Sequence, residues 1–179
     1  MILPNIENFI GCDSSFEEAE IVLYGAPFDS TTSFRPGARF GPSAIRHESF
    51  GLETYSPYQD RDLMDIQVFD SGDLELCFGS SEKALADIQD RAEEILKSGK
   101  MPLLLGGEHL VTLAAVRAAA ERYPGLHVIH FDAHTDLRDD YLHLHAARTH
   151  WTGVPLHPGF LCNVQHDLPS PAFHAVCRG

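Results

Sequence analysis

Short apolar runs, each closed by a glycine or an aspartate, recur along the first 106 residues of the chain. Runs of this length are typical of buried β-strands. We therefore expect strands at residues 21–25, 66–69 and 101–105.

Two segments have the pattern of helices instead. From residue 80 to 98 the apolar residues keep helical spacing, with serines at the start as possible N-caps and Gly99 just past the end. Residues 110–122 are rich in Ala, Leu and Val and stop before a Pro-Gly pair. A further apolar run at 126–131 predicts another strand.

Strands and helices therefore alternate along the chain. This order predicts an α/β fold in which helices cover both faces of a parallel sheet. In such sheets functional residues gather beyond the carboxyl ends of the strands.

Composition narrows the class of protein. The chain has 179 residues, 44% of them apolar, and a formal charge of -13, which argues against nucleic acid and favours a cationic small ligand. No run approaches the roughly 20 apolar residues of a membrane span, and no leader pattern opens the chain. We expect a cytoplasmic protein without a membrane partner. The cysteines show no Cys-x-x-Cys pairing and are interpreted as reduced thiols: Cys12, Cys77, Cys162 and Cys177.

The strongest chemical signal is the segment His-Phe-Asp-Ala-His-Thr-Asp at residues 130–136. Asp132, His134 and Asp136 alternate along the end of a predicted strand, and alternate residues point to one face. Two carboxylates and an imidazole suit manganese or a similar divalent ion. A solvated strand end with a chance histidine is the alternative.

A second signal follows the strand at 101–105. The segment Gly-Gly-Glu-His ends at His109, and its glycines allow a sharp turn that brings this histidine to the same edge of the sheet. We interpret His109 as a further metal ligand, whereas an ordinary strand-to-helix turn is the alternative.

The third signal is a long loop at residues 25–42, rich in Gly, Pro, Ser and Thr. A loop of this kind after a strand is typically shaped for function, whereas a surface loop of no chemical consequence is the alternative. Arg35 and Arg39 are expected to hold it by ion pairs or to contact a neighbouring subunit.

The character of the sequence changes at His143. Residues 143–179 contain six of the eleven histidines and only one acidic residue, Asp167, and show no helical or strand periodicity. A His-rich metal-binding tail would usually repeat one spacing, which is not seen here. We therefore favour a segment read out of frame or otherwise foreign to the fold, with a domain boundary between residues 142 and 143.

Together, the three motifs resemble the ureohydrolase family of arginases, agmatinases and guanidinobutyrases. The resemblance covers residues 1–142, and the long loop is most like that of bacterial agmatinases. It implies a three-layer α/β/α fold whose C-terminal part is missing from this chain. It also implies two Mn²⁺ ions bridged by a hydroxide that attacks the guanidinium carbon.

The resemblance also implies a role for each ligand. His109 and Asp136 would bind one manganese, His134 would bind the other, and Asp132 would bridge both. Glu108 stands where relatives often have aspartate. Two further features of the family, a downstream Asp-x-Asp pair and a substrate-facing histidine in a Ser-His segment, are absent from the sequence, so no catalytic or substrate-binding residue is assigned.

We therefore predict a polyamine-forming hydrolase that converts agmatine to putrescine and urea, with a small guanidinium cation as its ligand and a homo-oligomer as its assembly. The present chain is expected to have an incomplete metal centre. The alternatives are an arginase, a guanidinobutyrase or a non-catalytic metal-binding fragment.

Overall fold

The computed structural model describes residues 2, 7–32, 34–132, 161–166 and 173–177, the last two ranges by their backbone only. The chain forms two compact units, Met1–Ala115 and Val116–Gly179. Each unit is described by itself.

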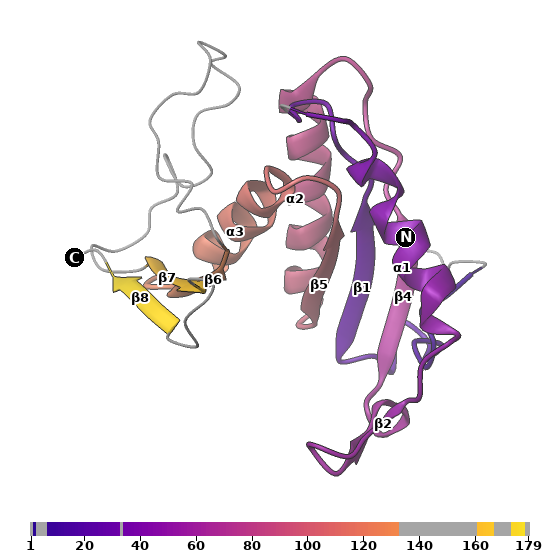
Figure 1. Cartoon of the computed structure of the whole chain (residues 1–179). Helices are drawn as coiled ribbons and strands as arrows, with labels where there is room; N and C mark the ends of the chain where they lie inside the picture. The colour runs from indigo at the N-terminus through magenta and orange to yellow at the C-terminus, as the bar shows by residue number, and fades with distance from the viewer. Residues whose placement is uncertain (1, 3–6, 33, 133–160, 167–172, 178–179) are drawn as a thin grey trace. The chain divides into compact units, whose positions relative to one another are not determined.

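The first unit is built on a parallel sheet of three strands in the order β4-β1-β5 (Figure 1). The strands are β1 (Ile21–Ala26), β4 (Val68–Asp73) and β5 (Met101–Gly106). In register, Ile21 of β1 lies beside Val68 on one side and Met101 on the other. The three strands predicted from the apolar runs are therefore confirmed, with β4 beginning two residues later and extending through Asp73.

The connections between these strands locate the functional edge of the sheet. The chain leaves β1 through α1 (Gly41–Ser49) to reach β4, and returns through α2 (Ser81–Lys97) to β5 on the other side of β1. Because such crossovers are right-handed, α1 and α2 cover opposite faces. The strand order reverses between β1 and β5, and ligands bind at the carboxyl ends of strands around such a point.

Helix α2 confirms the helical prediction for residues 80–98. The Ser80 hydroxyl accepts a hydrogen bond from the Lys83 N–H at 3.2 Å, and Gly99 follows the helix at φ +75°. Its buried residues lie on one face: Ala84, Leu85, Ile88, Ala92, Ile95 and Leu96. No helix in the described part of the chain is long and apolar enough to span a membrane.

Several short elements had no clear pattern in the sequence. They are the 3₁₀ turns η1 (Ala38–Phe40) and η2 (Leu63–Asp65), and the antiparallel pair β2 (Tyr55–Ser56) and β3 (Arg61–Asp62). Helix α1 follows η1 directly and has a proline in its first turn, where the missing N–H costs nothing.

A buried ion pair fixes α1 to the sheet. The Arg46 guanidinium donates to both carboxylate oxygens of Asp70, from Nε at 2.8 Å and from Nη2 at 2.9 Å, and its Nη1 contacts Asp73. Arg46 and Asp70 are 2% and 1% exposed. The N-terminal segment joins this network, because Phe9 N–H donates to Asp70 Oδ2 at 2.9 Å.

One prediction about burial was wrong. Strand β5 was expected to be buried, but Met101 and Leu103 are 55% and 46% exposed. These residues alternate along a strand that ends the sheet of the first unit, so one face of this edge strand remains uncovered in the described structure.

The second unit contains most of α3 (Val111–Arg122) and a second sheet. In that sheet β6 (Val128–Phe131) pairs in parallel with β7 (Leu161–His166), which pairs antiparallel with β8 (Phe173–Cys177). The predicted helix at 110–122 and the strand at 126–131 are confirmed. Strands β7 and β8 lie within residues 143–179, where the sequence shows no periodicity, because short strands are too brief to show a clear period. The predicted boundary at 142/143 lies outside the described residues.

Candidate functional site

The turn between β5 and α3 carries His109. This residue is half-buried, and its ring Nε2 atom is shielded from solvent. The turn lies at the carboxyl end of β5, as predicted, beside the carboxyl end of β1. His109 is therefore at the edge of the sheet where ligands of α/β proteins bind.

Gly107 is required here for close approach rather than for a left-handed turn. Neither Gly106 nor Gly107 has a positive φ. A Cβ atom added at Gly107 would lie 2.7 Å from the backbone nitrogen of Phe28, and closer still to its carbonyl oxygen. The sharp-turn explanation is thus replaced by a steric one, in which the loop after β1 passes directly against this turn.

Glu108 connects the turn to that loop. Its Oε1 atom accepts a hydrogen bond from Thr31 N–H at 3.1 Å and another from the Thr31 hydroxyl. Burial raises the pKa of the Glu108 carboxyl, while the hydrogen bonds from Thr31 oppose that rise. Glu108 therefore faces the loop rather than solvent.

Asp29 organises the loop from inside. It is 3% exposed, and its Oδ2 accepts from Gly37 N–H at 2.7 Å while its Oδ1 accepts from Arg39 Nε at 2.6 Å. The hydrogen bond from the Arg39 side chain is the main reason that the Asp29 pKa is lowered. The predicted ion pair of Arg39 is confirmed, whereas the Arg35 guanidinium lies 5.0 Å from the Phe34 ring centroid.

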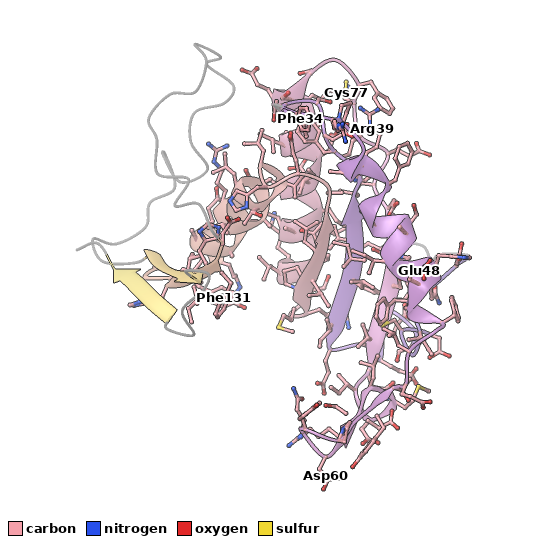
Figure 2. The ribbon with its side chains drawn as sticks, in the orientation of Figure 1. Phe34, Arg39, Glu48, Asp60, Cys77 and Phe131 are labelled. Atoms are coloured by element: carbon pink, nitrogen blue, oxygen red, sulfur yellow. The ribbon has the colours of Figure 1, made fainter. Side chains whose placement is uncertain are left out.

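Arg39 also reaches the segment after β4. Its guanidinium lies 5.6 Å from the Phe78 ring centroid, a cation–π contact. Figure 2 shows Arg39 at the same end of the unit as Phe34 and Cys77. Charged side chains thus hold the described part of the loop predicted at residues 25–42.

In the second unit, Asp132 directly follows β6. Its Oδ2 lies 3.6 Å from Nε2 of His130, which is 8% exposed, while the intervening Phe131 is 76% exposed (Figure 2). The alternation expected for Asp132, His134 and Asp136 stays a prediction, because His134 and Asp136 lie outside the described residues. The pairing of His130 with Asp132 was missed, although their two-residue spacing was visible in the sequence.

The four predicted ligands are not all placed by the structure. His109 belongs to the first unit and Asp132 to the second, and each is described with its own neighbours. His134 and Asp136 lie outside the described residues. Their roles therefore stay predictions.

The donors that are described suit a divalent ion. His109 offers a shielded imidazole nitrogen and Asp132 a half-buried carboxylate. Nitrogen and oxygen donors without thiolates are compatible with Mn²⁺. The residues present therefore fit the metal that the resemblance implies.

Comparison with known proteins identifies the family. The sequence model of the arginase family matches residues 19–164. The agmatinase of Bacillus subtilis (strain 168) is 53% identical over 133 residues, which are 74% of this chain and 46% of the relative. The N(1)-aminopropylagmatine ureohydrolase of Thermococcus kodakarensis is 42% identical over 127 residues, 70% of this chain and 43% of that protein. The chain thus matches less than half the length of these relatives.

Solved structures agree on the fold. The agmatine ureohydrolase of Thermoplasma volcanium has a TM-score of 0.78 at 28% identity, covering 93% of this chain and 59% of that one. Proclavaminate amidino hydrolase from Streptomyces clavuligerus has a TM-score of 0.75 at 31% identity, covering 94% of this chain and 59% of that one. These likenesses confirm the arginase-like α/β fold. The chain belongs to the arginase family.

Proposed function

We propose that this chain supplies the N-terminal metal ligands of a manganese-dependent agmatinase, which converts agmatine and water to putrescine and urea. The observation that carries the proposal is the match to agmatinases over the segment that includes both strand ends, with His109 after β5 and Asp132 after β6.

The ligand roles follow the motif. His109 and Asp136 would hold one ion, His134 the other, and Asp132 both. A pair of divalent ions lowers the pKa of water, so that a nucleophile is available at neutral pH, and it orients that nucleophile toward the substrate.

The charge of the chain favours a cationic substrate. The net charge of -13 attracts a ligand with positive charges and no carboxylate, such as agmatine, more than it attracts arginine. A homo-oligomer and a cytoplasmic location stay predictions that the resemblance and the composition support.

The 179-residue chain itself is expected to release almost no urea. The carboxylates that the family places in a downstream Asp-x-Asp pair are absent from residues 143–179. A centre with fewer anionic ligands offsets less of the cost of dehydrating the ions.

The test uses two proteins. One is the chain as it is, and the other is a chimera in which residues 1–142 continue into the C-terminal part of the Bacillus subtilis agmatinase. With Mn²⁺, the chimera should release urea from agmatine much faster than from arginine or 4-guanidinobutanoate. Strong urea release by the 179-residue chain would refute the incomplete centre, and an arginine preference by the chimera would refute the substrate.

Three other functions are compared in the same assay. An arginase or a guanidinobutyrase would differ in what holds the far end of the substrate, and the substrate panel identifies it. A non-catalytic metal-binding fragment is the remaining alternative. It would bind Mn²⁺ while the chimera stays inactive toward every guanidinium substrate.

A further inference from the structure

Glu108 makes contacts that its position in the motif does not require. It lies directly before the proposed ligand His109, and its side chain accepts two hydrogen bonds from Thr31, one from the backbone and one from the hydroxyl. These bonds join residues 77 positions apart in the sequence.

The backbone reinforces this contact. Gly107 N–H donates to the Ala26 carbonyl at 2.9 Å, and Glu108 N–H donates to the Phe28 carbonyl at 2.8 Å. The lack of space for a side chain at Gly107 shows that the two segments touch. The β5–α3 turn and the β1–α1 loop therefore form one hydrogen-bonded assembly within the first unit.

Asp29 binds the C-terminal end of the same loop. Through its bonds to Gly37 and Arg39, this buried carboxylate ties residues 37–39 back to the start of the loop. The stretch between Thr31 and Gly37 is thus fixed at one end by Glu108 and at the other by Asp29. Both attachments are made by carboxylates of low exposure.

We propose that Glu108 is a positioning residue, which holds the β1–α1 loop through Thr31 against the turn that carries His109. The loop and the metal-ligand turn are then ordered together, before metal or substrate binds. The link from this assembly to metal binding rests on the proposed function, because it takes His109 as a ligand. The attachment of the loop does not depend on it.

Hydrogen exchange of the 179-residue chain tests the attachment. Thr31→Val removes the hydroxyl donor with little change in shape, and Thr31→Ser retains it. Amides in peptides covering residues 29–37 should exchange about two- to tenfold faster in Thr31→Val, the effect of one net hydrogen bond. Thr31→Ser should exchange like the wild type, and α2 should be unchanged in both variants. Equal protection of the loop in Thr31→Val and the wild type would overturn the proposal.

Manganese affinity tests the link to His109. The paramagnetic resonance signal of free Mn²⁺ measures even weak binding. Thr32→Val is the matched control, because among the described residues the Thr32 hydroxyl bonds within the loop alone, to the Asp29 carbonyl at 3.0 Å. Thr31→Val should weaken Mn²⁺ binding by about tenfold, as removal of a residue that orients a metal ligand does. Thr32→Val should bind like the wild type, although it also loses a hydroxyl bond.

The outcomes separate the two proposals. Faster loop exchange together with weaker Mn²⁺ binding in Thr31→Val alone supports the positioning role. Faster exchange with unchanged affinity would overturn the coupling to His109 and leave the proposed function intact. If the wild type binds no Mn²⁺, the metal site of the proposed function fails, and the exchange rates alone decide whether Glu108 holds the loop.

Discussion

Arg46 provides a quantitative test of how this fold is held together. Arg46→Met would remove both guanidinium hydrogen bonds to the Asp70 carboxylate. Asp70 is 1% exposed, so water cannot replace them. Breaking a buried ion pair by removing one partner costs about 3–5 kcal/mol of unfolding free energy. Phe9 N–H and Gly72 N–H still donate to Asp70 at 2.9 Å each, so we expect a loss near the lower end, about 3 kcal/mol.

The control is a surface pair with a similar donor–acceptor distance. Lys97 Nζ lies 2.7 Å from Glu93 Oε2, but the Lys97 side chain is 73% exposed. Lys97→Met should therefore cost less than about 1 kcal/mol. Denaturant unfolding followed by circular dichroism measures both variants. Equal losses in the two would refute the argument that burial, rather than distance, determines the contribution of these pairs.

Three further outcomes are expected. Gly107→Ala should lower the unfolding free energy by about 1–3 kcal/mol, because the added Cβ would overlap Phe28. Gly51→Ala, where the atom nearest to the added Cβ would be 3.4 Å away, should change the unfolding free energy far less. Equal effects of the two substitutions would contradict the close approach at Gly107. The Asp29 pKa is lowered from its usual 3.8, so the contribution of the Asp29 carboxylate to the unfolding free energy is present above that pH and is lost as pH falls through the folded pKa. The difference in unfolding free energy between the wild type and Asp29→Asn should therefore shrink in acid. A difference that grows in acid would contradict this prediction. Calorimetry of the 179-residue chain should show weak Mn²⁺ binding, whereas two tightly bound equivalents would show that the centre is complete.

Local sequence patterns predicted strands β1, β4 and β5 and helices α2 and α3, but not α1, whose first residues lie in the segment interpreted as a loop. The helical period at residues 80–98 and its serine cap predicted α2, since both signals lie within the helix itself. The runs that became β1 and β5 were visible for the same reason. The exposure of one face of β5 was not predictable, because it depends on which strand ends the sheet.

The contacts that organise the candidate site come from residues far apart in the sequence. Thr31 and Glu108 are joined only when β1 and β5 pair, and Arg46 meets Asp70 only when α1 packs on the sheet. No periodicity marks such pairs. The ligand assignments at His109 and Asp132 came instead from the motifs. A motif predicts which residues bind the metal, but not the contacts that hold those residues in place.

The most direct test of the central claim is urea release from agmatine by the chimera when Asp132 is replaced. Asp132→Ala should abolish Mn²⁺-dependent urea release, because this carboxylate is proposed to hold both ions. Glu53→Ala, which removes an exposed acid, should leave the rate unchanged. An Asp132→Ala chimera as active as the Glu53→Ala chimera would contradict the claim that this chain supplies ligands to the metal centre.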